Sequence, residues 1–130
     1  MNASMAMNQY KEVRVQSLVM DATPHRLIQM LMEGVLEKIA LAKGNILRKE
    51  IAQKGENIGK AITIVGGLQA SLDKEKGGEL AENLNSLYGY MSQRLLMANL
   101  QSDEAILDEI ADLMLEIKAG WDAIPGILNV

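Results

Sequence analysis

The sequence of 130 residues contains no cysteine and only one histidine, His25. Without cysteine the chain has no disulfide framework, no thiol redox chemistry and no thiolate metal site. A single histidine also leaves no multi-histidine zinc site. Iron in helical bundles needs Glu-x-x-His pairs on two helices, whereas here Ala22 stands three residues before His25 and there is no second histidine. A purely carboxylate metal site is possible in principle, but no spacing suggests it, so we expect no metal and no cofactor.

The sequence also has no phenylalanine, and its aromatic residues are only Tyr10, Tyr88, Tyr90 and Trp121, whereas it has nine methionines. Methionine is flexible and polarizable, so it fills irregular gaps in a core and also suits binding surfaces that must adapt to a partner. This composition modestly favours an adaptable surface.

Long apolar runs are missing as well. No stretch of about 18 apolar residues is present, which excludes a transmembrane helix of ordinary length. The first seven residues (MNASMAM) lack both a charged start and an apolar stretch of the length that a secretory signal needs. We expect a cytoplasmic protein without membrane insertion.

The net charge of −4 is spread unevenly along the chain. From Ser102 onward there are seven acidic residues against Lys118 alone, and before Ser102 there are ten acidic and twelve basic residues. A chain without a basic patch is a poor ligand for nucleic acid or for an anionic membrane. The acidic C-terminal part is either an ordinary solvated face or a docking surface for a basic partner.

Apolar periodicity dominates the part that follows Thr23. Thr23 is a good N-cap and Pro24 suits the first helical position, and from Leu27 apolar residues recur in steps of three and four. We expect helices at about 24–45, 49–72 and 79–100, with a polar turn at 73–78. A fourth helix is expected between an N-cap at Ser102 and a stop at Pro125-Gly126. Four glycines of the second helix either permit close packing or leave a groove, namely Gly55, Gly59, Gly66 and Gly67.

Short connections between helices of this length favour antiparallel neighbours. The predicted fold is therefore all-α, an antiparallel up-down four-helix bundle with a short N-terminal arm or extra helix. We expect one domain over 1–130, with an arm at 1–22, the bundle at 23–124 and a tail at 125–130. The arm has too few apolar residues to fold by itself.

Two catalytic alternatives have weak support. Residues 55–61 (GENIGKA) resemble a phosphate loop only superficially, because the spacing is short by one residue and no Ser or Thr follows the lysine. A histidine phosphotransfer domain would place its histidine in mid-helix on an exposed face, whereas His25 lies in a first helical turn beside Pro24.

Four blocks of the sequence resemble the flagellin export chaperone family, FliS. They are residues 23–34 (TPHRLIQMLMEG), 71–73 with 77–84 (SLD, GGELAENL), 87–91 with 94–99 (LYGYM, RLLMAN), and Trp121. Tyr10 resembles an early tyrosine of the family. Two positions depart from its pattern, Met32 where Tyr or Phe is usual and Val35 where Ala is usual, and both stay apolar.

The resemblance implies a cytoplasmic, non-enzymatic chaperone that binds the C-terminal region of flagellin, prevents premature polymerisation and assists delivery to the flagellar type III export gate. Flagellin is then the first partner and the export gate a second one. A disordered amphipathic segment of this kind can lay its apolar face into a groove between helices.

By the same resemblance Tyr10 is the best single contact residue, on an arm that covers an apolar groove until flagellin binds. Further candidate contacts lie on the stripes of the first and third helices: Leu27, Met30, Leu31, Met32, Leu36, Tyr88, Met91 and Leu95. A stripe residue can equally belong to the core, so both roles stay open. The alternative function is a helical adaptor or assembly module for another protein, and we expect a monomer or weak homodimer.

Overall fold

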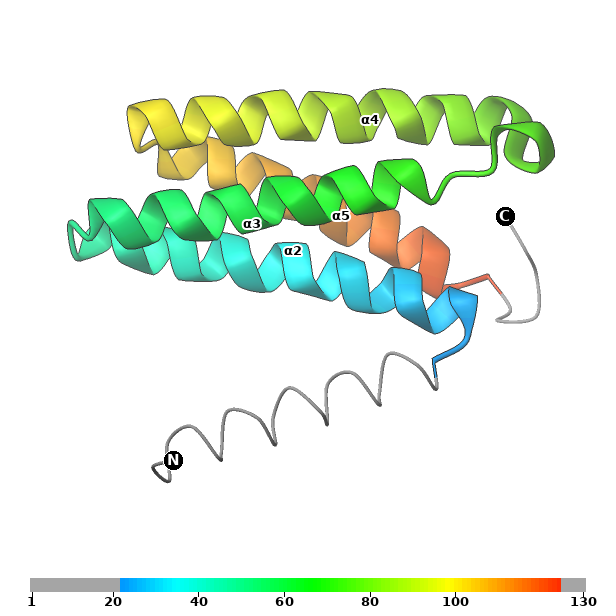
Figure 1. Cartoon of the computed structure of the whole chain (residues 1–130), viewed down its shortest axis with the longest axis horizontal. Coiled ribbons are helices and arrows are strands. Elements are labelled where there is room, and N and C mark those ends of the chain that lie inside the picture. Colours follow the sequence, from blue (N-terminus) through cyan, green and yellow to red (C-terminus); the bar gives the residue numbers. More distant parts are fainter. Residues whose placement is uncertain (1–21, 125–130) are drawn as a thin grey trace, which may run out of the picture.

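The computed structural model describes residues 22–124 as four helices, shown in Figure 1 with the labels used below. They are α2 (Pro24–Leu47), α3 (Ile51–Ala70), α4 (Lys74–Gln101) and α5 (Glu104–Asp122). The described residues contain no strand. The predicted arm with Tyr10 and the predicted tail at 125–130 lie outside the described residues, so the division into arm, bundle and tail stays a prediction.

The four helices form an up-down bundle. The connections at 48–50, 71–73 and 102–103 are so short that each helix must return alongside the one before it. In Figure 1 successive helices run in opposite directions, with α2 beside α3 and α5, and α4 beside the same two helices. The prediction of an all-α antiparallel bundle is confirmed.

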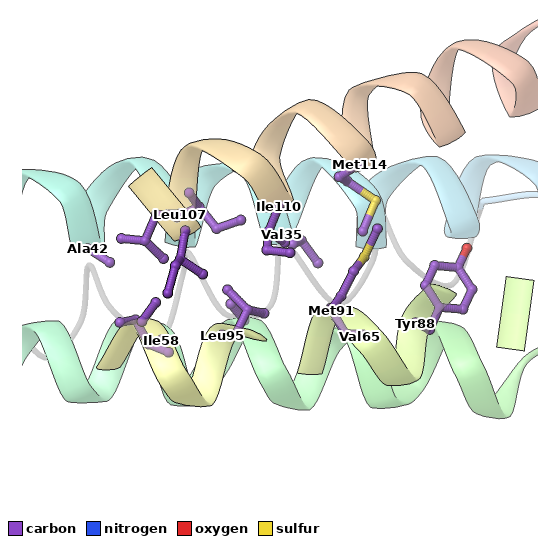
Figure 2. Packing of buried hydrophobic residues seen from close by; sticks show 14 of the residues in the cluster. Val35, Ala42, Ile58, Val65, Tyr88, Met91, Leu95, Leu107, Ile110 and Met114 are labelled. Carbon is purple, nitrogen blue, oxygen red and sulfur yellow. The ribbon is translucent and has the colours of Figure 1, made fainter. Parts of the chain in front are cut away.

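The core lies along the bundle axis and draws on all four helices. Figure 2 shows side chains of α2 and α5 meeting those of α3 and α4, with Met91 and Met114 pointing toward one another. These side chains come from the apolar stripes that the sequence predicts, and most of them have no exposed surface. Packing of the stripes, rather than helix propensity, stabilises helices of this length.

The start of α2 follows the prediction. The Thr23 hydroxyl accepts a hydrogen bond from the Arg26 N–H at 3.1 Å, and Pro24 is the first helical residue. The predicted start of α3 near Lys49 is two residues too early. Lys49 adopts a left-handed conformation with φ of 58°, so no right-handed helix can include it, and α3 begins at Ile51.

The predicted turn at 73–78 is wrong in part. Asp73 is an N-cap whose carboxylate accepts from the Lys76 N–H at 3.0 Å, and one helical turn follows. Gly78, with φ of 50° and ψ of −128°, then breaks the helix, in a conformation that favours glycine. The regular part of α4 follows Gly78, close to the predicted start at Glu79.

The predicted N-cap at Ser102 is wrong. Asp103 caps α5 instead, since its carboxylate accepts from the Ala105 N–H at 2.9 Å. Ser102 has φ of 49° and ends α4, and its hydroxyl accepts a hydrogen bond of 2.6 Å from the buried ammonium of Lys54. The same ammonium donates to the Asn99 carbonyl at 2.9 Å, so a lysine of α3 satisfies the end of α4.

The glycines of α3 do not serve close packing. A Cβ added to Gly59, Gly66 or Gly67 would meet nothing within 4 Å. Gly55 and Gly59 instead line a shallow open groove beside Lys38 on α2. Two roles were predicted for these glycines, and Gly55 and Gly59 have the second one, since they leave an open groove.

Candidate functional site

An apolar cavity lies at the end of the bundle where α2 and α4 begin and α3 and α5 end. Its volume is about 310 Å³, and its walls are mostly apolar. The lining residues are Ile28, Met32, Ser71, Leu72, Asp73, Leu80, Ala81, Leu84, Tyr88, Glu116, Ile117, Gly120, Trp121 and Ile124. We call this cavity the end pocket. An apolar concavity with a few polar groups is the usual form of a binding site.

The end pocket exists because α5 leaves α4 at this end of the bundle. Figure 1 shows α5 starting beside the end of α4 and finishing beside the start of α2. Leu80 on α4 therefore remains 51% exposed at the pocket, although it lies on the apolar stripe of its helix. Because α5 and α4 diverge here, α4 does not cover one side of the apolar stripe of α5 near Ile117.

A clasp between His25 and Trp121 holds the end of α5 against the start of α2. Their rings stack with centroids 4.9 Å apart and an interplanar angle of 14°. His25 Nε2 donates to the Trp121 carbonyl at 2.9 Å, and Trp121 Nε1 donates to the His25 carbonyl at 3.0 Å. Because a carbonyl oxygen can only accept, the proton of a neutral His25 ring lies on Nε2.

A second contact beside the clasp involves Asp122. Its carboxylate accepts from Gln29 Nε2 and from Lys118 Nζ, each at 2.7 Å. The hydrogen bond from Lys118 lowers the pKa of the Asp122 carboxyl, with a smaller effect from Gln29. Trp121 and Asp122 together position the wall that α5 contributes to the end pocket.

Tyr88 lies on the inner wall of the pocket and is only 2% exposed. Burial raises the pKa of its phenol to about 12. The Tyr88 hydroxyl makes no hydrogen bond within the described residues. It is not, however, among the completely buried polar atoms without a partner. Figure 2 shows the hydroxyl pointing away from α4. It is a polar contact available to a ligand in an apolar site.

Two other classes of site are missing from residues 22–124. No group of three or more His, Cys, Asp or Glu side chains there is arranged to hold a metal ion. Within the same stretch, no helix is sufficiently long and apolar to cross a membrane.

The sequence pattern of the family described as flagellar protein FliS matches residues 6–127 of this chain. The chain belongs to the FliS family. It is 54% identical over 124 residues to the flagellar secretion chaperone FliSB of Pseudomonas aeruginosa, covering 95% of this chain and 98% of that one. It is 44% identical to the flagellar secretion chaperone FliS of Salmonella typhimurium, covering 88% and 86%, and 40% identical to that of Vibrio cholerae, covering 89% and 85%.

The contact residues predicted from the FliS resemblance do not form one surface in the structure. Met32 and Tyr88 line the end pocket. Met91 and Leu95 are completely buried in the core. The remaining residues on α2 are half-buried outside the pocket, and these are Leu27, Met30, Leu31 and Leu36. No observation tests the binding role of any of them, and Tyr10 lies outside the described residues.

Most of the pocket residues were not predicted as contact residues from the sequence. Ile28, Leu72, Leu84, Ile117 and Trp121 all lie on predicted apolar stripes and line the pocket. One signal was available, because an up-down bundle brings the first turns of one helix beside the last turns of its neighbours. The apolar residues nearest those helix ends are the ones least enclosed by a third or fourth helix.

Proposed function

We propose that this protein is a flagellar secretion chaperone that binds the C-terminal segment of flagellin, with the end pocket as the anchor of the complex. The observation that carries the proposal is an open apolar pocket at one end of the bundle, in a chain of the FliS family. Such a chaperone catalyses no reaction, and it acts in the bacterial cytoplasm.

The size of the end pocket limits what it can contribute. A volume of about 310 Å³ holds one or two side chains. Full burial of one leucine-sized side chain contributes about 1.5–3 kcal/mol. Association itself costs at least about 4 kcal/mol, and ordering a disordered segment costs about 2–5 kcal/mol more. The pocket therefore fixes the register of a longer segment, which must bury further apolar surface elsewhere.

The outer side of α2 is the proposed continuation of the interface. Leu27 and Met30 lie within two residues of Ile28, which lines the pocket, and both keep part of their surface exposed. Leu31 extends the side of Leu27 toward the middle of the helix, whereas Leu36 lies on the opposite flank of the inward-facing stripe. Met91 and Leu95 contribute through the packing behind the pocket, since neither has exposed surface of its own.

The arm with Tyr10 is a separate part of the proposal. An apolar arm without a core of its own can cover the groove in the free protein and leave it when flagellin binds. Deletion of residues 1–20 then changes the affinity for flagellin, and an unchanged affinity would remove the arm from the mechanism. Delivery to the export gate requires a second contact, for which no residue is assigned.

A filled pocket provides the sharpest test. Gly120 lines the pocket, and a Cβ added there meets nothing within 4 Å, so Gly120→Leu should fill the pocket without a clash. Gly66→Leu is the matched control, since Gly66 is also helical and has the same free space but lies outside the pocket. Both variants keep the fold, which circular dichroism verifies.

The assay titrates each protein with the C-terminal segment of the flagellin from the same organism, by calorimetry and circular dichroism together. We expect a one-to-one complex, a gain of helix and a negative heat-capacity change. Gly120→Leu should weaken binding at least about tenfold, which corresponds to roughly 1.4 kcal/mol, and Gly66→Leu should leave it unchanged. Absence of binding by the unmodified protein at tens of micromolar would favour the adaptor alternative, and equal affinity of the two variants would place the anchor elsewhere.

A further inference from the structure

The charged side chains that line the end pocket are all acidic. Asp73 lies at the start of α4 and Glu116 lies on α5, and no lysine or arginine is among the lining residues. Apart from these two, the lining is apolar except for the hydroxyls of Ser71 and Tyr88. A ligand in this pocket therefore meets apolar walls and a negatively charged rim.

Neither carboxylate forms an ion pair with the described part of the chain. Glu116 is exposed and forms no ion pair with a lysine or arginine there. The only basic residue of its helix, Lys118, donates to Asp122 at 2.7 Å instead. In Asp73, Oδ1 caps α4 through the Lys76 N–H, whereas Oδ2 accepts no hydrogen bond from the described residues.

The surroundings of Glu116 have the same sign. Acidic residues recur in steps of four along α5, at Glu104, Asp108, Asp112 and Glu116. Residues four apart lie on one side of a helix, so these carboxylates form a stripe that ends at the pocket. Within this stripe Asp108 is paired with Lys43 at 2.5 Å, whereas Glu116 has no such partner among the described residues.

We infer that the end pocket selects a segment in which an apolar anchor residue has a lysine or arginine three or four residues away in the sequence. The apolar side chain enters the pocket, and the basic side chain pairs with Glu116 and Asp73 at its rim. This inference rests on the proposed function and gives the chemistry of the flagellin segment that the pocket accepts. A helical segment places residues three and four apart about 5–6 Å from one another, which matches an anchor inside the pocket and a charge at its edge.

The rim charges mainly give selectivity. An exposed ion pair contributes about 0.2–1 kcal/mol, so loss of one rim charge should weaken binding by roughly 1.5- to fivefold. The effect should fall with salt, because charges at a surface are screened over about 8–10 Å at physiological ionic strength. The apolar anchor should be nearly independent of salt, which separates the two contributions.

The experiment measures binding of the flagellin C-terminal segment to the full chain carrying Glu116→Gln, Asp73→Asn or both. Asparagine is as good an N-cap as aspartate, so Asp73→Asn removes the charge and keeps the cap. Glu37→Gln is the control, because Glu37 is exposed on α2, forms no ion pair in the described structure and does not line the pocket. All three single substitutions change the net charge equally. A second set of segments replaces each lysine or arginine by glutamine, one at a time.

We expect the double variant to bind roughly five- to tenfold more weakly at about 25 mM salt, and the difference to shrink at about 300 mM. At one basic position of the segment, replacement by glutamine should weaken binding to the Glu37→Gln protein but not to the double variant. The inference would be overturned if Glu37→Gln weakened binding as much as the rim substitutions do. It would also be overturned if every basic residue of the segment contributed as much to binding the double variant as to binding the unmodified protein.

The two proposals fail differently. If the unmodified protein does not bind the segment, both fail. If Gly120→Leu abolishes binding while the rim variants bind as the unmodified protein does, the proposed function holds and the selection of a basic residue is refuted.

Discussion

The clasp between His25 and Trp121 gives a prediction that can be worked out from the structure. His25→Ala removes the hydrogen bond from Nε2 to the Trp121 carbonyl, at 2.9 Å, and the stacking of the two rings at 4.9 Å. A hydrogen bond contributes about 0.5–1.5 kcal/mol to stability, and an aromatic pair contributes about 0.5–1.5 kcal/mol. The second hydrogen bond, from Trp121 Nε1 to the His25 carbonyl, does not use the histidine side chain and is kept.

Two corrections reduce the sum for His25→Ala. Both rings are only partly buried, so each contribution lies in the lower half of its range. Alanine also has a higher helix propensity than histidine, by up to about 0.7 kcal/mol. The expected loss in the free energy of unfolding is therefore about 1 kcal/mol, which lowers the melting temperature of a domain of this size by about 3–6 °C.

Denaturation in urea measures this loss, and His25→Phe separates its two parts. Phenylalanine keeps the stacking and loses the hydrogen bond, so His25→Phe should be about half as destabilising. Trp121 is the only tryptophan of the chain, so its fluorescence reports directly on the same contact. If His25→Ala changes neither the free energy of unfolding nor the fluorescence, the clasp does not hold α5 and the explanation of the pocket is wrong.

Three further predictions concern the rest of the bundle. Lys54→Ala leaves the Asn99 carbonyl and the end of α4 without their hydrogen-bond donor. Urea denaturation should show a loss of about 2–3 kcal/mol in the free energy of unfolding. The control Lys60→Ala, on the exposed side of the same helix, should lose less than about 1 kcal/mol. Gly66→Ala should raise the melting temperature, because the new Cβ meets nothing within 4 Å and the helix gains about 0.4–1 kcal/mol; an unchanged or lower value would contradict this. Burial raises the pKa of Tyr88 from 10.0 to about 12, so the folded state holds the phenol proton more tightly than the unfolded state does. This difference stabilises the folded state fully below pH 10. The stabilisation should be lost as the pH rises to about 12. Tyr88→Phe should lack this loss when the free energy of unfolding is measured against pH, and identical pH profiles would refute the assignment.

The helices could be predicted because each one depends on local sequence. Apolar steps of three and four, the Thr23-Pro24 start and the polar connections are properties of a few neighbouring residues. The errors fell where a distant contact decided between two local options. Ser102 and Asp103 are both good N-caps, and Asp103 became the cap because Ser102 turns into a left-handed conformation beside Lys54, which lies 48 residues earlier in the sequence.

The site was harder to predict than the fold. Met32 and Tyr88 were named from the sequence and line the pocket, but Met91 and Leu95 lie on the same stripe of α4 as Tyr88 and are fully buried. A stripe has the same pattern whether a partner helix covers it or leaves it open. Periodicity therefore identifies the residues that face inward and does not show which of them reach solvent.

The sequence by itself determined the helices, their up-down order and membership of the FliS family, because these depend on local spacing and on blocks of matching residues. The tertiary structure alone decided where an apolar stripe stays open. His25 and Trp121 are 96 residues apart in the sequence, and their contact joins the end of α5 to the start of α2, where α5 has diverged from α4. The end pocket results from this divergence, since two helices that separate can no longer cover each other's apolar side chains.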